Sequence, residues 1–189
     1  MLVPVKAFGV AKLRLARALA PGPREALARS MAATVVRAAE GLPVAVVCDD
    51  AGVATWAAGL GARVVWAPDR GLDGAVSDGV RALAGAGAQQ VIVAHADLPL
   101  ATALAWVARF PGVTVVPDGR DDGTNVVCVP ASCEFPFAYG PGSFARHAAA
   151  AIRGGLPLRV VRDPRLGLDV DTPADLDRAG LANLVTAAR

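Results

Sequence analysis

Residues 44–66, VAVVCDDAGVATWAAGLGARVVW, contain one complete repeat of the pattern that decides the fold. The apolar, β-branched run 44–48 predicts a buried strand, and the run 63–66 predicts a second strand. Between them, the Ala-rich segment 51–60 has the length of a helix. Parallel strands need a crossover of this kind, so this stretch predicts a β-α-β unit.

The same alternation extends along the chain on both sides of this unit. Further strands are predicted at residues 2–5, 90–94 and 113–116, and further helices at 24–40, 74–84 and 102–110, with Pro23 at a helix start and Gly41 at a helix end. We therefore predict an α/β fold: a single-domain, Rossmann-like, mostly parallel sheet with helices on both faces, spanning residues 1–189. In such a fold the ligand site lies beyond the carboxyl ends of the strands.

The pattern changes after residue 120. We predict a strand at 124–129, then a loop rich in proline, glycine and aromatic residues at 134–142, then a helix at 143–153. The loop is a candidate lid over the substrate. Two short strands at 158–162 and 168–170 are expected to follow, and Thr172 is predicted to cap a last helix that begins at Pro173.

Composition excludes several classes of protein. Hydrophobic residues make up 54% of the chain and charged residues 19%, which excludes a disordered chain, and a net charge of +2 gives no indication of nucleic-acid binding. No apolar run reaches the ~20 residues of a membrane span. The 3 cysteines lack the spacing of a disulfide framework or a zinc site and indicate a reducing compartment, so we predict a cytoplasmic protein. The 2 histidines have no nucleophile elbow nearby, which argues against a hydrolase triad.

Three aspartates are candidate metal ligands. Asp169 and Asp171 would project to the same side of the strand predicted at 168–170, and Asp97 follows the strand predicted at 90–94. A hard divalent cation accepts carboxylate oxygen and relieves the repulsion between such groups. The alternatives are a solvated strand end for Asp169, a helix-terminus acid for Asp171 and a turn residue for Asp97. We expect His95 to point away from Asp97 and to be a structural group.

The loop after the first strand supplies cations. Lys6, Lys12 and Arg14 lie there, and their positive charges suit the oxygens of a triphosphate. The loop has neither the Walker pattern nor the Gly-x-Gly-x-x-Gly pattern, which favours a nucleotide site of another kind. The alternative is a solvated basic loop, to which we assign Arg17.

Two turns are candidate anion sites. Thr124 and Asn125 follow a glycine turn and offer a hydroxyl and an amide, while Gly140 and Ser143 lie beside the start of the helix predicted at 143–153. Either turn suits a carboxylate or a phosphate. Ordinary turn chemistry is the alternative in both cases.

In combination, these segments resemble the 2-phospho-L-lactate guanylyltransferase family of coenzyme F(420) biosynthesis, which includes the phosphoenolpyruvate guanylyltransferases. The resemblance runs over nearly the whole chain and rests on VPVK (3–6), AKLRL (11–15), ADLPL (96–100), DGTN (122–125), YGPGSF (139–144) with His147, and DVDTP (169–173). The sequence departs from the family pattern at His95, where a small residue is expected, and at Asp73, where an asparagine is expected. If that asparagine contacts the nucleotide in the family, then Asp73 at this position affects which nucleotide base the chain prefers.

The resemblance implies a nucleotide-diphospho-sugar-transferase-like fold and an enzyme that transfers GMP from GTP to a small phosphorylated acid with release of pyrophosphate. It also implies that Asp97, Asp169 and Asp171 hold Mg²⁺ and that Thr124, Gly140 and Ser143 bind the acid; we add Asn125 to the acid-binding residues. We predict catalytic roles for Lys6, Lys12 and Asp97, and nucleotide binding by Lys6, Lys12 and Arg14.

Phosphoenolpyruvate is the favoured acceptor, or else 2-phospho-L-lactate. The alternatives are 3-phospho-D-glycerate as acceptor, a related CTP-dependent nucleotidyltransferase, and a non-catalytic nucleotide-binding module. We expect no nucleic-acid or membrane partner, and the resemblance is compatible with a homodimer.

Overall fold

The computed structural model describes residues 1–181, and its strands form one seven-stranded sheet in the order β3-β2-β1-β4-β6-β5-β7. The strands are β1 (Leu2–Pro4), β2 (Ala45–Cys48), β3 (Arg63–Trp66), β4 (Gln90–Ala94), β5 (Val113–Pro117), β6 (Thr124–Pro130) and β7 (Leu158–Val160). All pairs are parallel except the two that β6 forms with β4 and β5. The prediction of a mostly parallel α/β sheet is therefore confirmed.

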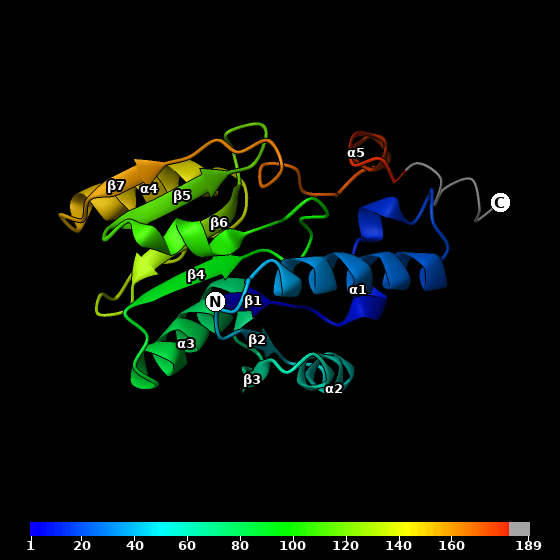
Figure 1. The fold of residues 1–189 in the computed structure, drawn as a ribbon. Coiled ribbons are helices and arrows are strands. Elements are labelled where there is room, and N and C mark those ends of the chain that lie inside the picture. The colour runs from blue at the N-terminus through cyan, green and yellow to red at the C-terminus, as the bar shows by residue number, and fades with distance from the viewer. Residues whose placement is uncertain (182–189) are drawn as a thin grey trace.

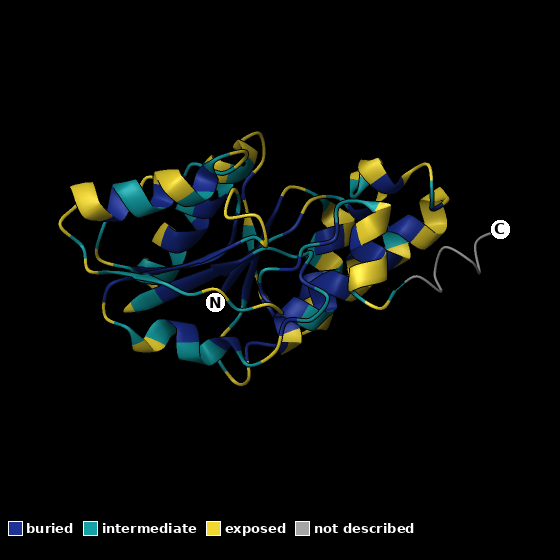
Figure 2. Ribbon diagram, turned by 90° about the horizontal axis from the view of Figure 1, so that it is seen from above, coloured by how far each residue is buried: buried dark blue, intermediate teal, exposed yellow. Residues whose placement is uncertain are grey.

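Helices cover both faces of the sheet, as predicted. Helices α1 (Pro21–Arg37) and α2 (Ala51–Gly59) pack on one face, and α3 (Gly71–Gly85) and α4 (Ser143–Arg153) on the other (Figure 1). The cause is the alternation of side chains along each strand: in β1, Leu2 packs with α3 while Val3 packs with α1. Most strands are dark blue in Figure 2, which identifies the sheet as the centre of the core.

A third apolar cluster lies beyond the carboxyl ends of the strands. It joins α1 to α5 (Pro173–Arg178), which Figure 1 shows on the side toward which β4 points. Its buried members are Leu15, Leu19, Leu27, Met31, Val170 and Leu176. This cluster holds the loop after β1 and the segment before α5 against each other, so polar side chains from both meet at the end of the sheet.

Two predicted elements differ from the structure. The segment 168–170 belongs to no strand, because β4 is already paired on both sides by β1 and β6 and the segment crosses its end instead. The helix predicted at 102–110 is a 3₁₀-helix, η3 (Leu104–Arg109). It is short because Ala103, with φ of +49°, precedes it and Pro111 follows it.

The other predicted elements are present with small shifts at their ends. Helix α1 begins three residues before the predicted start and ends at Arg37, because Glu40 and Gly41 have φ of +47° and +87°. Helix α3 begins at Gly71, three residues early, and α5 begins at Pro173 as predicted. The loop after β1 contains two 3₁₀-helices that were not predicted, η1 (Phe8–Val10) and η2 (Leu13–Leu15).

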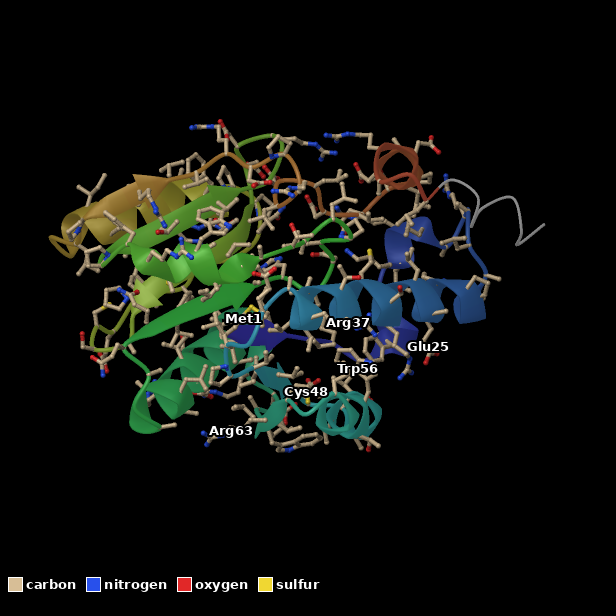
Figure 3. All side chains as sticks on the ribbon, in the orientation of Figure 1. Met1, Glu25, Arg37, Cys48, Trp56 and Arg63 are labelled. Carbon is tan, nitrogen blue, oxygen red and sulfur yellow. The ribbon has the colours of Figure 1, made fainter. Side chains whose placement is uncertain are left out.

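The loop after β1 is anchored to the helices of one face. Phe8 packs edge-on against Trp56 of α2, with 5.1 Å between ring centroids, and Figure 3 labels Trp56 on that helix. Arg24 of α1 donates to the Ala11 carbonyl at 3.1 Å. Among residues 1–181, no helix combines the length and the apolar character that crossing a bilayer requires.

The packing of α3 on β1 yields a stability prediction. A methyl group at Gly79 would lie 2.6 Å from Cδ2 of fully buried Leu2, whereas a methyl group at Gly85 of the same helix meets nothing within 4 Å. We expect Gly79→Ala to lower the free energy of unfolding by about 1–3 kcal/mol through overpacking. Gly85→Ala should leave it unchanged or raise it by up to ~1 kcal/mol. Urea unfolding checks both, and equal stability of the two variants would contradict the packing described.

Candidate functional site

The three predicted metal ligands converge at the end of β4. One carboxylate oxygen from each of Asp97, Asp169 and Asp171 lies within 4.8 Å of the others. Asp97 follows β4, and the segment that carries Asp169 and Asp171 is held across the strand end by the hydrogen bond from Val170 N to Asp97 O, at 3.2 Å. A backbone crossing, and not the predicted strand, therefore brings the acids together.

Asn125 at the start of β6 holds Asp169 in this cluster. Its side-chain nitrogen donates to the Leu166 carbonyl at 2.9 Å and to Asp169 Oδ1 at 3.4 Å. Because β6 runs antiparallel to β4, its first residues reach the same edge of the sheet as the end of β4. Both hydrogens of the Asn125 amide are thus directed at the protein, although Asn125 was predicted to contact the substrate.

Two cations of the first loop contact the acids. Lys12 Nζ lies 2.5 Å from Asp97 Oδ2 and 2.9 Å from Asp171 Oδ1, and Arg14 Nη1 lies 3.2 Å from Asp171 Oδ2. Lys12 has φ of +54°, a left-handed conformation that costs a non-glycine residue ~1–2 kcal/mol. Such strain is often found at functional sites. Lys6 is exposed and lies on the wall of the neighbouring cavity.

The charges of the cluster depend on one another. Burial alone would raise the pKa of Asp97, but the charge and hydrogen bond of Lys12, together with His95 and a backbone hydrogen bond, outweigh burial and the pKa is lowered. Burial would likewise lower the pKa of Lys12, but Asp97 and Asp171 raise it. Burial and the nearby Asp97 charge raise the pKa of Asp169. At neutral pH Asp97 is therefore ionised and Lys12 is positively charged.

The donor set fits a hard divalent cation. All three ligands are carboxylates, which Mg²⁺ and Ca²⁺ prefer. Within residues 1–181, Asp97 Oδ1 is buried and has no hydrogen-bond partner. Because a buried oxygen without a partner is costly, this oxygen is available to a metal ion.

Two adjoining cavities, of about 530 and 270 Å³, meet at the acid cluster. The larger cavity has Lys6, Lys12 and Asp97 on its wall, and the smaller one has Thr124, Asn125, Gly140, Ser143 and Asp169. Arg14, His95 and Asp171 line both. Of the predicted nucleotide-binding residues, Lys6 and Lys12 thus line only the larger cavity, whereas the predicted acid-binding residues line only the smaller one. Of the predicted metal ligands, Asp171 lines both cavities, Asp97 the larger one and Asp169 the smaller one.

The expectation that His95 points away from the site is wrong. His95 lines both cavities, and its ring packs against Tyr139 with 4.9 Å between centroids. Strand β4 ends at Ala94, and His95 and Asp97 are two positions apart, so alternation does not separate them. Burial lowers the pKa of His95, which favours the neutral ring.

The start of α4 is bound to the protein rather than open to an anion. Gly142 N donates to Asp122 Oδ1 at 3.0 Å, Ser143 N to Gly140 O at 3.0 Å and Phe144 N to Asp122 O at 3.0 Å. Within the described part of the chain, the Gly140 N–H has no hydrogen-bond acceptor. Gly140 lines the smaller cavity together with the hydroxyl-bearing residues Thr124 and Ser143.

Asp73 and Asp122 have positioning contacts that the sequence did not indicate. Asp73 Oδ1, on the first turn of α3, accepts from Tyr139 N at 2.7 Å. Asp73 therefore binds the loop before α4, and this contact links the helix beside the larger cavity to the wall of the smaller one. Both residues lie in stretches whose sequence is typical of turns. Aspartate is common in turns for local reasons, so the sequence alone does not indicate these contacts.

His147 of α4 is fully buried between the loop and β6. Its Nε2 lies 3.0 Å from Ala138 N, and its Nδ1 lies 3.0 Å from Thr124 Oγ1. Burial lowers the pKa of His147 to about 4. The ring is therefore neutral at physiological pH.

The fold is one that nucleotidyltransferases use. A Methanothermobacter nucleotidyl transferase superposes with a TM-score of 0.65 at 18% identity, covering 100% of this chain and 99% of its own. A Desulfovibrio desulfuricans G20 protein, provisionally named a nucleotide-diphospho-sugar transferase, superposes with a TM-score of 0.77 at 16% identity, covering 98% of this chain and 93% of its own.

The sequence places the chain more narrowly. Residues 1–182 match the family described as "Guanylyl transferase CofC like", and the chain belongs to this family of guanylyltransferases. It is similar to the phosphoenolpyruvate guanylyltransferase of Sphaerobacter thermophilus, 39% identical over 93% of this chain and 89% of that protein. It is similar also to the one from Thermomonospora curvata, 41% identical over 96% of this chain and 82% of that protein.

Metal binding by the acid cluster is testable with Mn²⁺, whose free and bound forms differ in their EPR signal. We expect Asp169→Asn to weaken Mn²⁺ binding by at least ~10-fold, since even groups that only orient metal ligands contribute that much. Asp177→Asn is the matched control, because Asp177 is exposed on α5 outside the cluster. Equal affinity of the two variants would exclude the cluster as the metal site.

The buried His147 predicts a pH dependence of stability. The unfolded chain takes up a proton on this ring near its ordinary pKa of 6.5, whereas the folded chain does so only near 4, so the unfolded state binds more protons between these values. Its contribution to stability is therefore present above pH 6.5 and lost as the pH falls toward 4. We expect the difference in free energy of unfolding between wild type and His147→Gln to shrink over this range. Urea unfolding at several pH values measures this difference. A difference that does not change with pH would refute the conclusion that His147 is buried as a neutral ring.

Proposed function

We propose that this chain transfers GMP from GTP to phosphoenolpyruvate, or else to 2-phospho-L-lactate, and releases pyrophosphate as a step of coenzyme F(420) biosynthesis. The observation that carries the proposal is the acid cluster at the junction of the two cavities. A reaction between two phosphorylated molecules needs positioning of both beside one charge-neutralising centre. The names of the relatives support phosphoenolpyruvate as the acceptor.

The larger cavity suits the nucleoside triphosphate. Its volume of about 530 Å³ and its apolar wall, which includes Phe8 and Leu72, fit a base and ribose. Lys6, Lys12 and Arg14 supply positive charge for the phosphates.

The smaller cavity suits a three-carbon acid with a phosphate. Thr124 and Ser143 offer hydroxyls, and Gly140 offers its N–H. Arg120 and Arg178 also line this cavity and supply charge for an anion. Asn125 acts in this proposal by holding Asp169 in place.

The reaction requires no general base, because the attacking oxygen is already ionised. An ionised phosphate oxygen of the acceptor forms a bond to the α-phosphorus of GTP, and the bond from that phosphorus to the β-phosphate oxygen breaks, so its electron pair leaves with pyrophosphate. Lys12 and Lys6 stabilise the charge on the leaving group. Mg²⁺ held by Asp97, Asp169 and Asp171 would neutralise charge on the phosphates. Burial lowers the pKa of both histidines, which makes each a weaker proton acceptor and fits a mechanism without a general base.

Three further predictions accompany this proposal. A single nucleotidyltransferase domain over 1–189 is our expectation, of which residues 182–189 lie outside the described part of the chain. A homodimer and a cytoplasmic location remain predictions as well.

The first experiment measures pyrophosphate release with Mg²⁺, each of the four NTPs and each of three acceptors: phosphoenolpyruvate, 2-phospho-L-lactate and 3-phospho-D-glycerate. We expect release with GTP and phosphoenolpyruvate. Release with CTP instead would correct the nucleotide, and GTP binding without release with any acceptor would favour a non-catalytic module.

A variant pair tests the site in the same assay. We expect Lys12→Met to lower kcat by about 100-fold or more, the usual loss when a preorganised charge contact is removed. Arg17→Met removes an exposed cation from the same loop and should leave kcat unchanged. Equal effects of the two substitutions would refute a specific role for Lys12. Thermal melting of both variants shows whether the fold is kept.

A further inference from the structure

The hydrogen bonds of His147 determine which ring nitrogen carries the proton. A backbone N–H can only donate, so Nε2, which lies 3.0 Å from Ala138 N, must be unprotonated and accept. The proton of the neutral ring is then on Nδ1, which lies 3.0 Å from Thr124 Oγ1. Nδ1 therefore donates to the Thr124 hydroxyl oxygen.

This bond orients the Thr124 hydroxyl. A hydroxyl has one proton to donate, and its oxygen is already accepting from His147, so its proton must point elsewhere. Thr124 is only 2% exposed, yet it lines the smaller cavity. Within residues 1–181, no group of the protein accepts a hydrogen bond from Thr124 Oγ1, which leaves the cavity as the direction of its proton.

The surroundings of His147 keep this arrangement in place. The ring lies among Phe135, Phe137 and Tyr139, with centroid distances of 5.8, 6.2 and 4.9 Å. Phe135 and Phe137 carry no hydrogen-bond acceptor, and the Tyr139 hydroxyl has no hydrogen-bond partner within residues 1–181, so none of the three takes the Nδ1 proton from Thr124. The same imidazole joins Ala138 of the loop to the start of β6, so loop position and hydroxyl orientation are set by one side chain.

We propose that His147 is a positioning residue for the acceptor: it fixes the Thr124 hydroxyl as a hydrogen-bond donor to an anionic oxygen of the phosphorylated acid. This inference rests on the proposed function, since it assumes that the acid occupies the smaller cavity. A carboxylate or phosphate oxygen only accepts, so a hydroxyl that is committed to donating matches it.

The first test measures the tautomer and needs no substrate. The chain has 2 histidines, so ¹⁵N spectra of the labelled protein contain two imidazoles, and comparison with His147→Asn assigns them. We expect His147 to have a protonated Nδ1 and an unprotonated Nε2 at pH 7. A protonated Nε2 would overturn the proposal, whatever the enzyme's substrate.

The second test separates the two hydrogen bonds of the ring. Asparagine places its amide nitrogen near the position of Nδ1, so His147→Asn keeps the donor to Thr124 and loses the acceptor for Ala138. Glutamine places its amide oxygen near the position of Nε2, so His147→Gln keeps the acceptor and loses the donor. Thr124→Ser, which keeps the hydroxyl, and Thr124→Val, which removes it, form the corresponding pair.

We expect His147→Gln and Thr124→Val each to raise the KM for the phosphorylated acid about 10-fold, as for the loss of one hydrogen bond to a charged group. The KM for GTP should stay within ~2-fold. His147→Asn and Thr124→Ser should stay within ~3-fold for both substrates. The double variant His147→Gln, Thr124→Val should be no worse than either single one, because the two residues act through one bond.

The outcomes separate the possible failures. Equal effects of His147→Gln and His147→Asn, or a parallel rise in the KM for GTP, would reduce His147 to a structural residue and overturn the proposal. If wild type turns over none of the acids, the proposed function fails, while the ¹⁵N spectra still decide the tautomer. Thermal melting of each variant identifies any that does not fold. If a His147 variant does not fold, the KM values of Thr124→Val and Thr124→Ser decide whether the hydroxyl binds the acid, and the ¹⁵N spectra decide whether His147 orients it.

Discussion

The structure depends on how three carboxylates are held within 4.8 Å of one another at the end of the central strand. Charges of one sign at that distance repel, and partial burial removes the water that would screen them. Lys12 and Arg14 supply the opposite charge, and Lys12 adopts a left-handed conformation there. Both the loop after β1 and the segment before α5 are shaped by this requirement. The same excess of negative charge provides the oxygens that a divalent cation binds.

The reversed direction of β6 builds the other half of the site. In a sheet of parallel strands only carboxyl ends reach the ligand edge, but β6 is antiparallel and brings its first residues there. Thr124 therefore faces the smaller cavity, and Asn125 beside it holds Asp169. One strand thus links the wall of the smaller cavity to the acid cluster.

The wall of the smaller cavity is held by several separate contacts. Asp73 and Asp122 accept from backbone N–H groups of the loop before α4, and His147 accepts from Ala138. Arg146 donates to four successive carbonyls of the same loop, those of residues 138–141. A loop rich in glycine and proline has no regular hydrogen bonding of its own, so these side chains determine its conformation. The wall of the smaller cavity is therefore preorganised, which lowers the entropic cost of binding a ligand there.

The sequence by itself determined the type and order of most elements and indicated the polar residues that gather at the acid cluster, because β-branched runs, helical lengths and polar residues after strands are local properties. It predicted Asp97, Asp169 and Asp171 together, although the strand on which that prediction rested is absent. Only the tertiary structure decided the direction of β6, the crossing of 168–170 over β4, the inward position of His95 and the loop contact of Asp73. These depend on which backbone groups remain unpaired once the sheet has formed, and no local pattern contains that information.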